Sequence, residues 1–211
     1  MTSLLVYPLR GVLRKFQVTT MSFEEKPECL VVSPGGCGTV SLINHLNKHV
    51  KSNLYFEKKY KFYALSHIYK PNVYLRKNKI KIILIHRSHT GIFNSLSSRG
   101  YIRHSLNFYG NSFPFFYINL FKNKKKLKKK FFSYLDFFYK NWNNYDKKQI
   151  LNLDYKNLYS DKNTKIKIKK FLNIKNKNFL TKFPIFKKYN KNKKNEDLST
   201  LLTKKIYEIK G

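Results

Sequence analysis

Acidic residues are scarce in this sequence. Asp and Glu number 11 against 44 Lys and Arg among 211 residues, so the formal net charge is +33. None occurs between Glu57 and Asp136. Because carboxylates are the usual ligands of hard cations, we expect no carboxylate-bound metal in the middle of the chain and an anionic partner there. The abundant Lys, Asn, Ile, Phe and Tyr have A/T-rich codons, so biased base composition is an alternative source of the charge.

Cysteine is almost absent as well. The spacing of Cys29 and Cys37 fits neither zinc ligation nor a disulfide framework, which suggests a reducing compartment. No apolar run approaches the roughly 18 residues of a transmembrane helix, and the N-terminal pattern is too weak for a signal peptide. We therefore expect a cytoplasmic protein without a transmembrane segment. Residues 1–27 are predicted to be an N-terminal extension, disordered or upstream of a start at Met21, and residues 28–211 a single domain.

Hydrophobic patterns along the chain alternate between short buried strands and amphipathic helices. Strands are expected at 29–33, 62–67, 80–85 and 150–153. Helices are expected at 39–50, 91–98, from 131 to about 145, 163–172 and 198–209. This alternation predicts an α/β fold with three α/β/α layers around a central parallel sheet.

Three finer expectations concern the middle of the chain. Thr90 is expected to cap the helix at 91–98. The lysine run at 122–130 is expected to be a solvated, irregular segment. The stripe on the following helix is expected to be core, and it consists of Phe131, Leu135, Phe138, Trp142 and Tyr145.

Polar residues follow each expected strand. Ser33-Pro34-Gly35 follows the first strand, His67 the second, Arg87 the third and Asp154 the fourth. In open α/β sheets, ligands bind beyond the carboxyl ends of the strands. We therefore expect these residues to share one site.

The stretch SPGGCGT, residues 33–39, joins the first strand to the first helix. Its three glycines allow a tight turn that exposes successive backbone N–H groups, and a helix N-terminus follows at Thr39. This arrangement predicts phosphate or oxyanion binding, although an ordinary strand–helix turn is the alternative. The stretch lacks the GK[ST] ending of an ATP-binding loop.

Arg87 ends the third strand, and Ser95 follows eight residues later on the next helix. A guanidinium and a hydroxyl can bind one phosphate together. The alternative is that Arg87 pairs with a carboxylate, for which Asp154 is the candidate.

Four segments, in order, resemble the sulfotransferases that use 3′-phosphoadenosine 5′-phosphosulfate (PAPS). CLVVSPGGCGTVSLINHL is similar to the family's 5′-phosphosulfate loop, and KIKIILIHRSHTGIFNSL to its 3′-phosphate motif. ILNLDYKNLYSD with IKKFLNIK, and LSTLLTKKIYEIKG, resemble later segments. The resemblance covers most of residues 28–211 and implies a P-loop NTPase-like fold.

The resemblance also implies site residues and a reaction. PAPS would be the co-substrate, no metal would be needed, and the acceptor would be a hydroxyl, for which we favour a carbohydrate. His67 would be the catalytic base, because family members place a histidine about twenty residues before the motif arginine. The donor would be bound by Gly35, Gly36, Cys37, Gly38, Thr39, Val40, Ser41, Arg87 and Ser95.

One departure concerns the lysine or arginine that the family's loop carries. It would align near Gly36 and is absent, and Lys70 is a candidate replacement. His67 could instead be a structural or surface histidine.

Two other functions stay open. A small ATP-dependent P-loop kinase or hydrolase would use Asp154 for magnesium. A basic nucleic-acid-binding protein is compatible with the charge and the aromatic content, but the lysines are spread widely and no such motif occurs, so no specific nucleic acid is expected.

Overall fold

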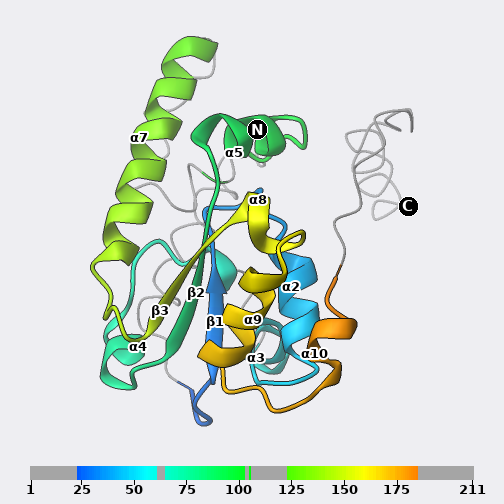
Figure 1. The fold of residues 1–211 in the computed structure, drawn as a ribbon. Helices are drawn as coiled ribbons and strands as arrows, with labels where there is room; N and C mark the ends of the chain where they lie inside the picture. The colour runs from blue at the N-terminus through cyan, green and yellow to red at the C-terminus, as the bar shows by residue number, and fades with distance from the viewer. Residues whose placement is uncertain (1–22, 61–64, 103–104, 106–122, 185–211) are drawn as a thin grey trace, which may run out of the picture.

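A parallel sheet of three strands forms the centre of the computed structural model, which describes residues 23–60, 65–102, 105 and 123–184 (Figure 1). The strands are β1 (Cys29–Val32), β2 (Lys81–His86) and β3 (Ile150–Asp154), and they lie in the order β1-β2-β3. Both pairings are parallel, with Val31 opposite Ile83 and Ile83 opposite Leu151. The apolar runs of β1 and β2 are buried, as expected for strands covered on both faces. The predicted α/β fold with a parallel sheet is confirmed.

Helices flank this sheet on both sides. In Figure 1, α2 and α9 lie together on one side and α7 runs along the other, which is consistent with three α/β/α layers. The helices are α2 (Thr39–Leu46), α3 (Asn53–Tyr60), α4 (Val73–Lys77), α5 (His89–Ser97), α7 (Lys124–Asn143), α8 (Tyr155–Leu158), α9 (Lys162–Phe171) and α10 (Asn178–Thr181), with the 3₁₀ turn η1 (Leu65–His67).

The core stripe predicted for the helix after residue 130 is confirmed on α7 and just beyond its end, where Tyr145 lies. All five of its residues are buried: Phe131, Leu135, Phe138, Trp142 and Tyr145. The Trp142 indole also donates a hydrogen bond to the carbonyl of Ile68 at 2.9 Å. The Tyr145 hydroxyl lies 2.7 Å from the carbonyl of Leu75 and 2.9 Å from that of Ile80. α7 therefore packs on the core and connects the segments that lead into β2.

Two local predictions are wrong. Residues 65–67 form a 3₁₀ turn instead of the end of a strand, because the carbonyl of Ser66 accepts a hydrogen bond from Ser33 N (2.8 Å) just beyond β1. Residues 62–64 lie outside the described part. Thr90 does not cap α5, because the helix begins at His89, two residues earlier than expected, and the Ser88 hydroxyl accepts from Gly91 N at 3.2 Å. The helix predicted at 198–209 lies outside the described residues.

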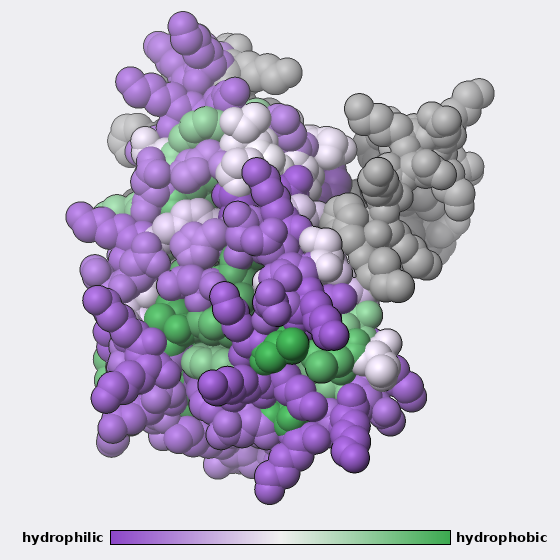
Figure 2. Space-filling view, viewed as in Figure 1, coloured by the Kyte–Doolittle hydropathy of each residue, from purple (hydrophilic) through white to green (hydrophobic). Residues whose placement is uncertain are grey.

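The lysine run is helical, which corrects the expected irregular segment. Lys124 begins α7, and the Asn123 side chain caps the helix by accepting from Lys126 N at 3.0 Å. Lysine is a good helix former, so a cap suffices to start the helix here. The end of α7 that projects in Figure 1 is hydrophilic in Figure 2. Among the described residues no helix, α7 included, is long and apolar enough to cross a membrane.

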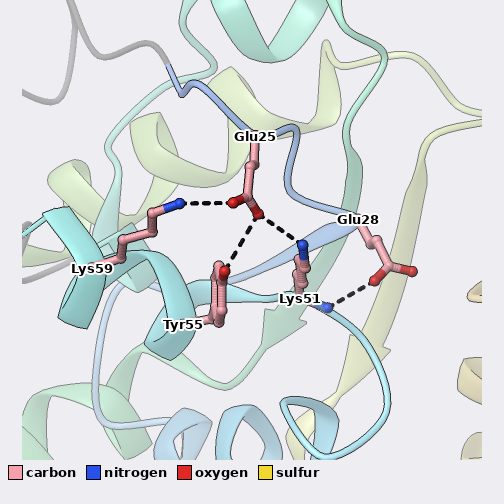
Figure 3. A network of polar contacts seen from close by, with 5 residues as sticks. All are labelled: Glu25, Glu28, Lys51, Tyr55 and Lys59. Atoms are coloured by element: carbon pink, nitrogen blue, oxygen red, sulfur yellow. Dashed lines mark hydrogen bonds and ion pairs between the residues drawn. The ribbon is translucent and has the colours of Figure 1, made fainter.

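The segment before β1 packs on the body of the domain. Phe23 is buried, and the Glu25 carboxylate lies 2.7 Å from the Nζ atoms of both Lys51 and Lys59 (Figure 3). Hydrogen bonds from these two lysines lower the pKa of Glu25 to about 2. Residues 23–27, predicted to belong to an extension, therefore contact the domain, whereas residues 1–22 lie outside the described part.

Asn53 binds the open edge of β1. Its side chain is buried and makes two hydrogen bonds to one residue, accepting from Val31 N at 2.7 Å and donating to Val31 O at 2.9 Å. It thereby satisfies the two backbone groups that a neighbouring strand would otherwise bind.

We predict that Asn53→Ala lowers the free energy of unfolding by roughly 2–5 kcal/mol, because each of two buried backbone groups loses its partner. Urea denaturation followed by Trp142 fluorescence measures the change. Asn44→Ala, at an exposed position of α2, is the matched control and should change stability by less than about 0.5 kcal/mol. Equal effects of the two substitutions would contradict the role assigned to Asn53.

Candidate functional site

The glycine loop between β1 and α2 has positive φ angles that residues with a side chain rarely adopt. Gly35, Gly36 and Gly38 have φ values of 96°, 67° and 64°. Turns of this kind direct successive N–H groups toward one point, where an anion can bind. Gly38 is the residue before α2 and forms no side-chain cap, so the first N–H groups of α2 add to the positive end of the loop.

Arg87 lies against this loop. It follows β2 directly, is half-buried, and donates a hydrogen bond from Nη1 to the carbonyl of Gly36. Its guanidinium also lies over the ring of Tyr155, 4.4 Å from the centroid. A Cβ atom on Gly91 would lie 2.9 Å from Arg87 Nε, so the absence of a side chain there makes room for the arginine.

No carboxylate within the described part of the chain forms an ion pair with Arg87. The ion pairs among the described residues involve Glu25 and Asp136, and neither includes an arginine. Asp154, the partner that the sequence suggested as an alternative, instead accepts from Lys156 N at 2.8 Å at the start of α8. A half-buried guanidinium without a carboxylate is costly to desolvate, and an anionic ligand would offset that cost.

Ser95 reaches the same loop from α5. A Cβ atom on Gly36 would lie 3.3 Å from both Cβ and Oγ of Ser95. The hydroxyl accepts a hydrogen bond at 3.1 Å from Nη2 of Arg99, a residue that the sequence analysis did not single out. The predicted association of the loop with Arg87 and Ser95 is therefore present in the structure, and it includes a second arginine.

The remaining loop residues from the sequence analysis differ in exposure. Cys37 and Thr39 are buried, whereas Val40 and Ser41 are exposed on the first turn of α2. The Cys37 thiol lies 3.2 Å from the carbonyl of Gly35, and burial raises its pKa to about 12. The thiol is therefore protonated at neutral pH and packs inside the loop instead of acting as a nucleophile.

Two tyrosines that the sequence analysis missed hold the end of the loop. Tyr159 donates a hydrogen bond to the carbonyl of Gly38 at 2.5 Å, and burial raises its pKa to about 12, so it remains a donor at neutral pH. A Cβ atom on Gly38 would lie 3.3 Å from Tyr155 Cε2. The available sequence signal was the position of YKNLY immediately after the last strand, at the edge where the site was expected.

His67 lies at the other end of the loop. Its Nδ1 is 2.8 Å from the carbonyl of Ser33, and a Cβ atom on Gly35 would lie 3.7 Å from its Cε1. Because a carbonyl can only accept, this contact places a hydrogen on Nδ1 and, in the neutral ring, a lone pair on Nε2. Lys70, the candidate replacement for the loop lysine, is exposed and forms none of the ion pairs found among the described residues.

No protein-family model matches the sequence, and no curated protein matches it significantly. Within the described ranges, no three His, Cys, Asp or Glu side chains form a group that could hold a metal ion. The site combines a glycine-rich turn before a helix N-terminus, a half-buried cation, a hydroxyl and a positioned imidazole.

Replacing Gly36 tests how closely the loop packs on α5. Gly36→Ala and Gly100→Ala both place a side chain at a similar positive φ, 67° and 69°, but a Cβ on Gly100 meets nothing within 4 Å. Both should lose roughly 1–2 kcal/mol through backbone strain. Gly36→Ala should lose about 1 kcal/mol more, because Ser95 must move. Thermal unfolding compares the two, and equal melting temperatures would show that the close contact with Ser95 is absent.

Proposed function

We propose that this protein is a sulfotransferase that moves a sulfuryl group from PAPS to an acceptor hydroxyl. The observation that carries the proposal is the half-buried Arg87 guanidinium, which lies against Gly36 of the glycine loop with no carboxylate partner among the described residues. An oxyanion ligand would satisfy both the guanidinium and the N–H groups of the loop. Ser95 beside Gly36 adds a hydroxyl for the same ligand.

The donor would bind through two parts of the site. Its 5′-phosphosulfate would be held by the backbone of residues 35–40 and by the hydroxyls of Thr39 and Ser41. Its 3′-phosphate would be held by Arg87 and Ser95. The proposal also implies a P-loop NTPase-like topology for the domain. The connection from β1 through the loop to α2 and the parallel pairing of β1 with β2 support this topology.

Two features favour this ligand over ATP with magnesium. The loop has no lysine for the terminal phosphates of ATP. Asp154, which would have to face magnesium, uses its carboxylate to cap α8. For the nucleic-acid alternative, the residues described at the strand ends offer no comparable feature.

The residues at the loop support an in-line transfer. The acceptor oxygen would bond to sulfur, the bond from sulfur to the phosphate oxygen would break, and adenosine 3′,5′-bisphosphate would leave. The acceptor proton would pass to Nε2 of His67, whose ring is oriented by the contact between Nδ1 and Ser33. The N–H groups of the loop and of α2 would stabilise the charge that develops on the leaving phosphate. The net charge of +33 favours an anionic acceptor, and we propose a carbohydrate hydroxyl.

Binding of adenosine 3′,5′-bisphosphate tests the donor site. We expect isothermal titration calorimetry to detect binding without magnesium, and Arg87→Ala to weaken it roughly 10- to 100-fold through loss of charge-assisted hydrogen bonds. Arg76→Ala is the matched control, because Arg76 also has one hydrogen bond to a carbonyl and one aromatic ring beneath it. No binding by the wild type, or binding of ATP that requires magnesium, would overturn the proposal.

The role of His67 is tested by His67→Asn. Asn keeps an N–H donor for Ser33 O but cannot act as a base, so the loop should stay intact. Transfer of radiolabelled sulfate from PAPS to a panel of polysaccharides should fall roughly 10²- to 10⁴-fold. The affinity of His67→Asn for adenosine 3′,5′-bisphosphate should change by less than about threefold. In the control His49→Asn, both the rate of transfer and this affinity should change by less than about threefold. A structural role for His67 would instead reduce binding and transfer together.

A further inference from the structure

The charge of the candidate donor site is incomplete if Arg87 is its only cation. A terminal phosphate carries close to two negative charges at neutral pH, and its second pKa is about 6. Arg87 supplies one positive charge and already directs one N–H to the carbonyl of Gly36. The loop itself contains no lysine or arginine. A second cation beside Gly36 would balance such a ligand.

Arg99 is held in a position to be that cation. Its Nε donates to the carbonyl of Ser95 at 2.8 Å, and its Nη2 donates to the Ser95 hydroxyl at 3.1 Å. Its guanidinium lies over the ring of Tyr101, 5.6 Å from the centroid. An arginine after the last turn of a helix commonly binds a carbonyl of that turn, which explains the first contact. The second contact turns the guanidinium toward the hydroxyl that faces Gly36.

The two arginines are therefore linked to Gly36 in different ways, Arg87 by direct contact and Arg99 through Ser95. Arg87 contacts the carbonyl of Gly36, while Arg99 contacts the serine whose hydroxyl would lie 3.3 Å from a Cβ on Gly36. Within the described part of the chain, neither guanidinium forms an ion pair. Both charges also act on the buried Cys37 thiol. Burial raises the pKa of this thiol, and the charges of Arg87 and Arg99 partly counteract that rise.

We infer that Arg99 is a second oxyanion-binding residue, which holds a terminal phosphate monoester together with Arg87 and the hydroxyl of Ser95. This inference rests on the proposed function for the identity of the nucleotide. The second arginine would also make the site selective for charge. Two guanidinium groups around one hydroxyl favour a dianionic terminal phosphate over a singly charged group. Arg99 would thereby supply a second positive charge at the 3′-phosphate, beside that of Arg87.

Calorimetry with two nucleotides tests this residue. Arg99→Ala should weaken adenosine 3′,5′-bisphosphate roughly 10- to 50-fold and adenosine 5′-monophosphate, which lacks the 3′-phosphate, by less than about threefold. Arg99→Lys should recover part of the loss, since lysine keeps the charge without the planar fork. Wild-type affinity for the bisphosphate should rise between pH 5 and pH 7, as the phosphate becomes dianionic, and this rise should be smaller in Arg99→Ala.

A double-mutant cycle separates a shared phosphate from two independent effects. If Arg87 and Arg99 bind one phosphate, Arg87→Ala with Arg99→Ala should lose less affinity than the product of the single losses. Arg76→Ala is again the control, and thermal unfolding of each variant shows whether it is folded. Wild-type affinity in Arg99→Ala, together with weak binding in Arg87→Ala, would overturn the role of Arg99 and leave the proposed function standing.

A second probe, inorganic pyrophosphate, tests whether the pair of arginines binds phosphate even if the sulfotransferase proposal is wrong. Pyrophosphate binding that depends on Arg99, without binding of the adenosine bisphosphate, would support the pair of arginines and overturn the sulfotransferase proposal. A wild-type protein that binds neither compound would overturn both.

Discussion

The contact between Arg87 and the carbonyl of Gly36 is the interaction on which the rest of the candidate site depends. It joins the end of β2 to the loop that follows β1, so it forms only when these two strands pair in their observed register. Gly91 leaves the space that the arginine occupies, and Tyr155 covers the guanidinium from α8. Residues from four separate segments are thus required to hold one positive charge beside one loop. That charge is half-buried, and this is why an anion is the ligand expected there.

A loop that carries its own lysine needs only local folding to bring charge to the phosphate. Here the loop contributes N–H groups and the charge comes from β2 and from the end of α5, so the site is assembled by tertiary packing. The tightness of this packing is visible at Gly36, where a Cβ would crowd Ser95, and at Gly38, whose carbonyl accepts from Tyr159 at 2.5 Å. Such an arrangement has little freedom to rearrange, which favours a pre-organised site over one that forms around a ligand.

The parts of this arrangement that could be predicted are those encoded in local patterns. Apolar runs gave three of the strands, and the spacing of Arg87 and Ser95 placed both at one edge of the sheet. The parts that could not be predicted depend on contacts between distant segments. Ser66 bonds to the residue after β1 instead of continuing a strand, and nothing within its own segment indicates this. Tyr159 likewise reaches a carbonyl 121 residues earlier in the chain.

The amount of positive charge can be read from the sequence, but the positions of the arginines depend on the fold. Base composition is sufficient to explain a large excess of lysine, and the exposed lysines along the first turns of α7 require no further cause. It does not explain where the arginines stand. The chain has only six, and the described part includes Arg76, Arg87 and Arg99. Arg87 contacts the glycine loop and Arg99 contacts the serine beside it, and a planar fork can bind an oxyanion in a way that an ammonium cannot. In a protein whose usual cation is lysine, the position of guanidinium groups is therefore more informative about binding than the net charge is.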